Sequence, residues 1–550
     1  MIICSIQRTP TGRNPMIIKK IKYKAIVAFS ILLASEALWA ASSNYTRNNI
    51  EYGFTGFTGD FDINTPEYLV TGKKMIDHLA SHEIDWLRMG TNISIKKYNS
   101  PTDIEFNTKD WEQSVKLYEY AKSKGMKIFF TTYPAYELTP KGLSERDFLT
   151  SVRNQYEHLA RKFPKADVWQ IYNEANTHHK DNYLSVCNHP DFACINNKPT
   201  SLPSQYMESL KKTITAARES IKKINPTARI TTNAENSEEY AKKYMRELKG
   251  TLDIFSFDIY PDEYDHANNF RNLKENLAQL KSEFGEKFWV VETGKPSSAG
   301  NCATESTANT EAQKKFLLNL IPAFAEQAVS HVMLYEFRDR DVQWYPECEK
   351  RFGISDRKNS EKPAFSPVLK LMQLYKYMPT QGNTVASSQG VYRIYLAYQE
   401  SFGRAPFKWE VYGDSNDGWL TKVINQNLSR ERIREINEDW LMSESGLREK
   451  QDVIIRSYQA VFGRTPKPHE LTNWKKSAFR GYSSLLKSHE NWLASQEAEN
   501  ERIDLITRSY QSVFHRPPTA IELNSWMSTP AKPFEALIEN HRNWIDYNQN

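Results

Sequence analysis

The 550-residue sequence has only five cysteines, no block of charge of one sign and no apolar run long enough to span a bilayer. The cysteines and histidines show no zinc-like spacing, which excludes a zinc-finger type of metal site. The formal net charge of +5 comes from basic residues interleaved with acidic ones, so the sequence predicts no nucleic-acid partner. What is present, 39% hydrophobic and 12% aromatic residues, is typical of a globular protein somewhat rich in aromatic rings.

The N-terminal segment has the organisation of an export signal. Lysines precede the apolar stretch "AIVAFSILLA", and small residues follow it in "SEALWAAS". We expect residues 1–40 to be a signal peptide cleaved after Ala37 or Ala40, with Met16 as an alternative start. The uncleaved alternative is a membrane anchor. The sequence thus predicts an exported protein, periplasmic or secreted.

Four cysteines remain after the signal, because Cys4 lies within it. An even number of cysteines in an exported protein permits disulfides. Three pairings are possible, and we favour Cys187 with Cys194, which closes the short loop "CNHPDFAC", and Cys302 with Cys348. Four free thiols are the alternative.

Residues 45–380 alternate between short apolar runs and longer amphipathic segments. In the amphipathic segments apolar residues recur every three or four positions, the helix period, and Gly125 and Gly285 stand where helix C-caps belong. Eight strands alternating with eight helices predict an α/β fold, a (β/α)8 TIM barrel, and the alternative is an open doubly wound sheet. The runs that indicate buried strands are "EYGFTGF", "IDWLRMG", "MKIFFTTYP", "ADVWQIYNE", "ARITTNAE", "LDIFSFDIYP", "KFWVVETG" and "HVMLYEFRD".

Polar or charged residues end nearly every predicted strand, which favours the barrel because these ends meet at one mouth. Cleavage of a glycosidic bond needs one protonated and one ionised carboxyl group. Glu174 ends the fourth strand and Glu292 the seventh, so the two would face each other across the mouth. Barrel geometry alone leaves three other carboxylates open as alternatives: Glu235, Asp258 and Glu336.

The strand-end motifs resemble those of clan A glycoside hydrolases. "VWQIYNEAN" is similar to the Asn-Glu signature of the fourth strand of that clan, and "FWVVETG" to its Glu-bearing seventh strand. "FDIYP" and "FGISDRKNSEKPAF" also look like the clan, and the nearest likeness is to family 39 and its relatives that degrade bacterial exopolysaccharide. The resemblance covers residues 45–380. It departs at the eighth strand, where many members carry Trp and this chain has "LYEFRD".

The resemblance implies a role for each matching residue. Glu174 would be the acid/base, with its pKa raised by apolar surroundings, and Glu292 the nucleophile of a retaining mechanism. Asn173 would donate to the 2-hydroxyl of the sugar, while Arg88 and Tyr260 would hydrogen-bond Glu292. No metal or cofactor is implied. Further candidates for binding the polysaccharide substrate, from predicted loops and strand ends, are Tyr133, His178, Glu336 and Trp344.

Each assignment has a structural alternative. Asn173 and Glu174 are also compatible with a helix N-cap. Arg88 is also compatible with a structural ion pair, and Tyr260 with a core position. The sequence thus predicts an exported retaining glycosidase, endo-acting on a bacterial extracellular or capsular polysaccharide. The alternatives are an exo-acting enzyme and a carbohydrate-binding barrel without activity.

The C-terminal part has a different composition and an internal repeat. After a predicted linker at residues 381–390, residues 391–550 contain three copies of one motif: "YQESFGRAP", "YQAVFGRTP" and "YQSVFHRPP". A tryptophan recurs with a spacing of 52 residues, as Trp440, Trp492 and Trp544. These features predict an all-α region of three repeats, each with its tryptophan in the core and its motif proline at the first position of a helix.

The repeats resemble a bacterial domain of unknown function, numbered 4214, found on extracellular proteins. The resemblance implies a possible glycan-binding or cell-surface-binding appendage, and a structural spacer is the alternative. His515 replaces glycine in the third copy, and we expect this replacement to alter one turn.

Overall fold

The computed structural model describes most of the chain from Ile50 onward. The predicted signal peptide, all five cysteines and the predicted disulfides lie outside the described residues. Among the described helices, none is both long enough and apolar enough to cross a membrane. The described residues are 50–58, 66–91, 93, 95–132, 143–176, 204–297, 307–340, 349–357, 360–380, 382–413 and 418–548.

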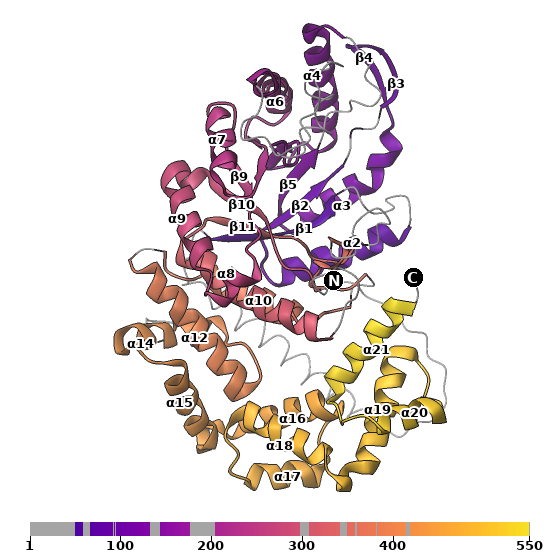
Figure 1. Ribbon diagram of the computed structural model, residues 1–550, viewed down its shortest axis with the longest axis vertical. Helices are drawn as coiled ribbons and strands as arrows, with labels where there is room; N and C mark the ends of the chain where they lie inside the picture. Colours follow the sequence, from indigo (N-terminus) through magenta and orange to yellow (C-terminus); the bar gives the residue numbers. More distant parts are fainter. Residues whose placement is uncertain are drawn as a thin grey trace, which may run out of the picture.

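A nine-stranded parallel sheet forms the N-terminal part, with the strand order β7-β6-β5-β2-β1-β11-β10-β9-β8. Its two edge strands, β7 and β8, are separated in the chain only by Thr232, so the sheet curls into a nearly closed barrel (Figure 1). The TIM-barrel prediction is confirmed, except that the fifth predicted strand is two short ones. The strands are β1 (Glu51–Thr58), β2 (Trp86–Gly90), β5 (Lys127–Thr132), β6 (Val168–Ile171), β7 (Arg229–Thr231), β8 (Asn233–Glu235), β9 (Phe255–Asp258), β10 (Phe288–Thr293) and β11 (His331–Leu334).

Helices follow the strands and cover the outside of the barrel (Figure 1). The helix α9 shows how the sequence specifies them: Leu273, Leu277, Leu280 and Phe284 are buried at three- and four-residue spacings, and Gly285 ends the helix with φ +61°. The helices are α2 (Pro66–Ser81), α3 (Glu112–Ser123), α4 (Glu145–Lys162), α6 (Ser204–Ile224), α7 (Glu239–Glu247), α8 (Glu263–Ala267), α9 (Arg271–Phe284), α10 (Thr307–Glu326) and α11 (Phe365–Tyr375).

A small hairpin, β3 (Ile95–Ser100) with β4 (Asp103–Phe106), stands apart from the barrel sheet between β2 and α3. The sequence pattern did not predict it. Its exposed and half-exposed side chains alternate along both strands, so it carries no buried apolar run to indicate a strand.

Large side chains fill the inside of the barrel. Trp86 and Trp289 are at most 1% exposed and their rings meet edge to face at 5.2 Å, which confirms that Trp289 is a core residue. Phe129, Val168 and Met333 belong to the same buried cluster. Because this interior is packed, polar groups that act on a ligand have to lie at the carboxyl ends of the strands.

The C-terminal region is all helical. Each repeat pairs a long first helix with a last helix, and α10 of the barrel contacts both α12 and α21, so the repeats form an arc beside the barrel (Figure 1). Residues 384–390, predicted as linker, are the first turns of α12. The helices are α12 (Thr384–Phe402), α13 (Lys408–Tyr412), α14 (Trp419–Gln426), α15 (Arg430–Met442), α16 (Leu447–Phe462), α17 (Pro468–Lys476), α18 (Gly481–Leu493), α19 (Glu499–Phe514), α20 (Ala520–Met527) and α21 (Phe534–Asn548).

The recurring tryptophans are not the core of the repeats, contrary to the prediction. Trp440, Trp492 and Trp544 are 43%, 41% and 58% exposed, and each meets a phenylalanine edge to face. The half-buried tryptophans are a different set, and each donates from Nε1 to a motif tyrosine at 3.0–3.1 Å: Trp419 to Tyr398, Trp474 to Tyr458 and Trp526 to Tyr510.

The motif itself builds the turn between the first and second helices. In the middle repeat, Arg464 donates to both oxygens of Glu470, whose carboxylate also accepts from the backbone N–H of Lys467. The motif proline, Pro466, therefore precedes the N-cap residue Lys467, and Pro468 occupies the first helical position instead. The prediction for the motif proline was wrong because the arginine–glutamate pair begins the helix later.

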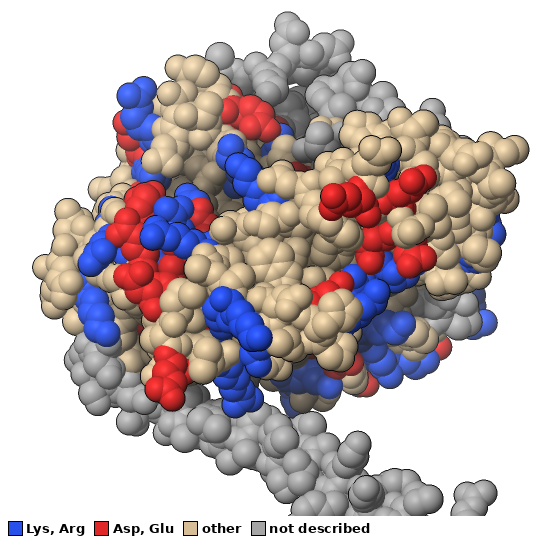
Figure 2. Space-filling model, turned by 90° about the horizontal axis from the view of Figure 1, so that it is seen from below, with Lys and Arg blue, Asp and Glu red and all other residues tan. Residues whose placement is uncertain are grey.

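Charged side chains of both signs are mixed on the surface. On the face seen from below, Lys and Arg side chains stand next to Asp and Glu side chains (Figure 2). The same interleaving is visible in the ion pairs of the repeats, such as Arg430 with Glu400 and Arg508 with Glu501.

Candidate active site

The backbone turns sharply where β6 ends and brings Glu174 to the barrel mouth. Tyr172 and Glu174 have φ values of +66° and +47°, a left-handed conformation that costs non-glycine residues roughly 1–3 kcal/mol. The turn is held from both sides, since the N–H of Tyr172 donates to the carbonyl of Thr132 at 3.0 Å and the N–H of Glu174 donates to Asn233 Oδ1 at 2.8 Å. These contacts keep the strained backbone in place and so fix the direction in which the side chain of Glu174 points.

Glu292, at the end of β10, receives two strong hydrogen-bond donors. Arg88 of β2 donates from Nη1 to Oε1 and forms a buried ion pair, and Tyr260 donates its hydroxyl to Oε2 at 2.9 Å. Desolvation of its hydroxyl and the neighbouring Glu292 carboxylate raise the pKa of Tyr260 well above its usual value although the residue as a whole is 40% exposed, so the phenol stays protonated and continues to donate. Both contacts stabilise the carboxylate form of Glu292, which suits a nucleophile.

A network of amides fixes Asn173 and Arg88. Asn173 Oδ1 accepts hydrogen bonds at 2.9 Å from Arg88 Nη2, from Gln170 Nε2 and from Asn233 Nδ2. Gln170 Nε2 also donates to Asn233 Oδ1 at 2.8 Å. Because its oxygen is fully engaged, the amide of Asn173 has one orientation, with its NH₂ group outside the network.

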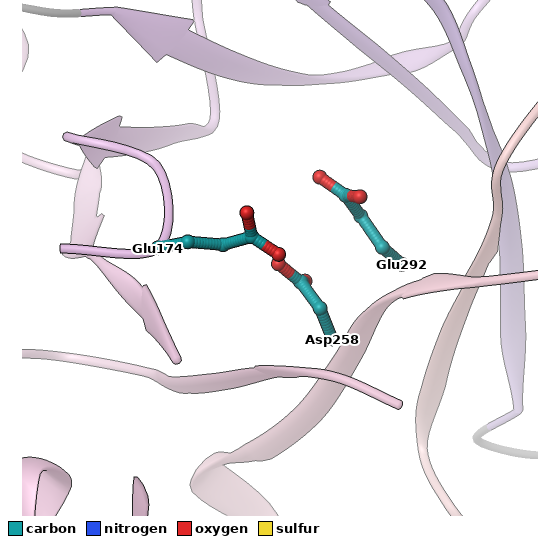
Figure 3. Close-up of side chains that lie close together, drawn as sticks. All are labelled: Glu174, Asp258 and Glu292. Atoms are coloured by element: carbon teal, nitrogen blue, oxygen red, sulfur yellow. The ribbon is translucent and has the colours of Figure 1, made fainter. Parts of the chain in front are cut away.

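Three carboxyl groups meet at the mouth: Glu174, Glu292 and Asp258 at the end of β9 (Figure 3). One carboxyl oxygen of each lies within 4.8 Å of the others. Figure 3 shows the carboxyl of Glu174 directed at that of Asp258, with Glu292 facing the pair. Asp258 is fully buried, and its burial together with the charges of Glu292 and Glu174 raises its pKa well above the usual range.

The arrangement suits acid/base chemistry with a nucleophile. Three carboxylate oxygens at this spacing are also ligands that a divalent cation accepts. Here, however, Arg88 already supplies positive charge to Glu292, Tyr260 donates to the second oxygen of Glu292, and Asn233 donates to one oxygen of Asp258. Arg88 and Tyr260 thus direct two donors at one carboxyl group, and a second carboxyl group lies close to it.

The structure brings together five of the predicted site residues and separates one. Arg88, Asn173, Glu174, Tyr260 and Glu292 form one connected cluster. Glu336 is only 2% exposed and forms an ion pair with Arg340 at 2.8 Å, and its contact with substrate stays a prediction. Three other predicted residues lie outside the described residues: Tyr133, His178 and Trp344.

Sequence reasoning missed Gln170 and Asn233 and left Asp258 among several alternatives. The first two carry a signal in retrospect, because each is a fully buried amide inside an apolar strand run. A buried amide needs hydrogen-bond partners, and both amides find them in the polar side chains of the site. The sequence did not show which carboxylate joins Glu174 and Glu292, because Glu235 and Glu336 also lie at predicted strand ends.

Comparisons with known proteins include one match to a family model. Residues 160–342, about a third of the chain, match the family "Glycosyl hydrolase catalytic core", and this segment contains both Glu174 and Glu292. No curated protein matches the chain.

Solved structures of glycosidases resemble the chain at low identity. A family 39 glycoside hydrolase from Bacteroides cellulosilyticus is 14% identical with a TM-score of 0.42, and the similarity covers 60% of this chain and 64% of that one. A β-glucosidase from the fungus Humicola insolens in complex with glucose is 13% identical with a TM-score of 0.42, covering 60% and 98%. A β-glucosidase from Thermotoga maritima in complex with deoxynojirimycin is 13% identical with a TM-score of 0.42, covering 60% and 99%.

We base the site on its own geometry and on the family match rather than on these distant likenesses. The carboxyl cluster lies at the carboxyl ends of β6, β9 and β10, where TIM-barrel enzymes carry their active sites. The segment that supplies all three carboxyl groups is thus the one that matches the family model "Glycosyl hydrolase catalytic core".

Proposed function

We propose that the protein is a retaining glycoside hydrolase in which Glu292 is the nucleophile and Glu174 the acid/base. The observation that carries this proposal is the pair of carboxyl groups with oxygens within 4.8 Å, one of them held by Arg88 and Tyr260. Retaining enzymes separate their carboxyl groups by about 5–5.5 Å, whereas inverting enzymes leave about 6.5–9.5 Å for a water molecule. The spacing supports retention.

The two steps divide the work between these residues. In the first, Glu292 attacks the anomeric carbon, the bond to the leaving oxygen breaks, and Glu174 gives its proton to that oxygen. In the second, Glu174 takes a proton from water, the water oxygen attacks the anomeric carbon, and the bond to Glu292 breaks. Asn173 is placed beside both residues with its NH₂ group outside the amide network, which supports a hydrogen bond from it to the 2-hydroxyl of the sugar.

For the substrate we propose a bacterial extracellular or capsular polysaccharide, cleaved internally by an exported enzyme. The signal-like N-terminus supports export, and the likeness of the strand-end motifs to exopolysaccharide-degrading relatives supports the substrate class. Products longer than one or two sugars early in the reaction would support endo action, and release of single sugars from the start would contradict it. Sequencing the N-terminus of the protein recovered from the periplasm and the medium tests export.

The decisive experiment is a screen of reducing-sugar release across purified polysaccharides. Wild-type protein is compared with Glu174→Gln and Glu292→Gln, each of which we expect to lose activity by about 10²- to 10⁴-fold or more with an unchanged circular dichroism spectrum. Glu235→Gln is the matched control, because Glu235 ends the neighbouring strand β8 but lies outside the carboxyl cluster. Full activity of either catalytic variant, or loss of activity in the control alone, would overturn the assignment.

Retention is tested separately with the substrate that the screen identifies. The anomer formed first is followed by proton NMR, and a 2-deoxy-2-fluoro glycoside of the same sugar traps the covalent intermediate. We expect the initial product to keep the configuration of the substrate and the label to appear on the peptide that contains Glu292. An initially inverted product would exclude the double displacement while leaving hydrolysis established.

A further inference from the structure

Asp258 is a third carboxyl group that the double-displacement mechanism does not use. It is fully buried at the end of β9 and lies against Glu174, with Glu292 on its other side (Figure 3). Its Oδ2 accepts a hydrogen bond from the neutral amide of Asn233. Its Oδ1 is also buried and meets no hydrogen-bond donor among the described residues.

The charges around Asp258 do not favour its ionised form. The group is faced by Glu174 from the turn after β6, by Glu292 from β10, and by Arg88 from β2. The guanidinium of Arg88 is engaged with Glu292, Asn173 and Gln170, so it makes no hydrogen bond to Asp258. An ionised carboxylate here would be buried beside two others with one shared cation, which is costly.

A proton on Asp258 removes this cost and also satisfies the second oxygen. A neutral carboxylic acid is a hydrogen-bond donor as well as an acceptor, and the group it lies against is the carboxyl of Glu174. Two carboxyl groups in direct contact cannot both be ionised without a large cost, so at least one of them holds a proton.

We propose that Asp258 is a positioning residue that stays protonated through the catalytic cycle and donates a hydrogen bond to Glu174, the residue that exchanges protons with the substrate. This inference rests on the proposed function. The bond turns the carboxyl of Glu174 toward the gap that separates it from Glu292, and it stabilises the Glu174 carboxylate that forms when the leaving oxygen takes its proton. Asp258 itself neither gains nor loses a proton in either step.

The direction of one pH shift separates a neutral Asp258 from an ionised one. If Asp258 is a neutral donor, Asp258→Ala removes a bond to the charged form of Glu174, so the pKa of Glu174 rises. The alkaline limb of the kcat profile then moves to higher pH by about one unit or more. If Asp258 is ionised, the same change removes a negative charge and the limb moves to lower pH.

The experiment compares wild type with Asp258→Ala, Asp258→Asn and Asp253→Asn on the polysaccharide that the screen identifies. We expect Asp258→Ala to lower kcat by about 10- to 100-fold and to move the alkaline limb of the kcat profile to higher pH. Asp258→Asn should keep most of the wild-type kcat, because its amide is also a neutral donor. Asp253→Asn is the matched control. Asp253 lies just before β9 begins, paired with Arg218, and its replacement should leave the limb in place.

A readout without turnover tests the proton directly. The infrared difference spectrum of wild type minus Asp258→Asn at pH 7 should contain the carbonyl band of a protonated carboxylic acid. Absence of that band, a limb that moves to lower pH in Asp258→Ala, or equal losses in the Ala and Asn variants would each overturn the proposal. Failure of the proposed function is distinguishable, because it appears as absence of hydrolysis by wild type while the infrared spectrum still reports the proton.

Discussion

The barrel mouth and the helical repeats both depend on polar contacts between side chains, but they are built in opposite ways. At the mouth, Arg88, Gln170 and Asn233 come from three strands far apart in the chain, and each makes its contacts once. In the repeats one set of contacts recurs: the pair of Arg464 with Glu470 has its equivalents in Arg404 with Glu410 and in Arg516 with Glu522. The network at the mouth occurs once and positions the residues of one site. The recurring arginine–glutamate pair instead defines a structural unit that the chain repeats three times.

The largest expected effect comes from breaking the unique network. Arg88→Met removes the one cation that pairs with Glu292 among the described residues and leaves that carboxylate buried without this partner. We expect kcat to fall by at least about 100-fold and the free energy of unfolding to fall by about 3–5 kcal/mol. Activity assays and urea unfolding measure the two effects. A variant with full activity would show that Tyr260 alone holds Glu292.

A pH effect on stability should arise in the repeats. Burial lowers the pKa of His489 and of His541 to about 4, and each ring hydrogen-bonds a buried serine, Ser457 and Ser509. Between about pH 6.5 and pH 4 the unfolded chain binds protons that the folded repeats do not. As the pH is lowered through this window, the free energy of unfolding therefore decreases by about 1.4 kcal/mol per pH unit for each histidine. Below that window the loss is complete, and above it the full stability is present.

Urea unfolding at pH 7 and pH 5 checks this expectation. The double variant His489→Gln/His541→Gln retains a polar group facing each serine and should show a smaller drop between the two pH values. An equal drop in wild type and in the double variant would place the pH sensitivity elsewhere.

A smaller effect tests how closely consecutive repeats pack. Gly463 has φ +63°, and a Cβ at this position would lie 2.4 Å from the ring of Phe534 in the next repeat. We expect Gly463→Ala to lower the free energy of unfolding by about 1–3 kcal/mol with no change in kcat. Hydrogen exchange in α16 and α21 should report the loss locally, and a change confined to the barrel would contradict the packing.

The smallest effect concerns the last copy. His515 adopts the same left-handed conformation as the glycines, with φ +57°, so the turn is unaltered and our expectation for it was wrong. His515→Gly relieves the strain but adds freedom to the unfolded chain, so we expect a gain of less than about 1 kcal/mol. Thermal unfolding measures it, and a loss of stability would show that the histidine side chain makes a useful contact.

The predicted strand-end residues show what a sequence pattern specifies and what it does not. The strand ends at Arg88, Glu174, Tyr260 and Glu292 were predicted from apolar runs and motif likeness, and the structure places all four in one cluster. Glu336 occupies an equivalent strand end, yet its charge is paired with Arg340. A strand end is a local property, whereas the partner of a charge depends on which loops fold over it.

The sequence by itself determined the barrel, the repeats and the pair of catalytic candidates, because hydrophobic periodicity, a 52-residue spacing and short motifs are all written along the chain. Only the tertiary structure decided which third carboxyl group joins the pair, which amides orient it, and which tryptophans of the repeats are buried. These are questions of contact between segments distant in sequence, and at the mouth the decisive quantity is how many negative charges one buried guanidinium has to balance.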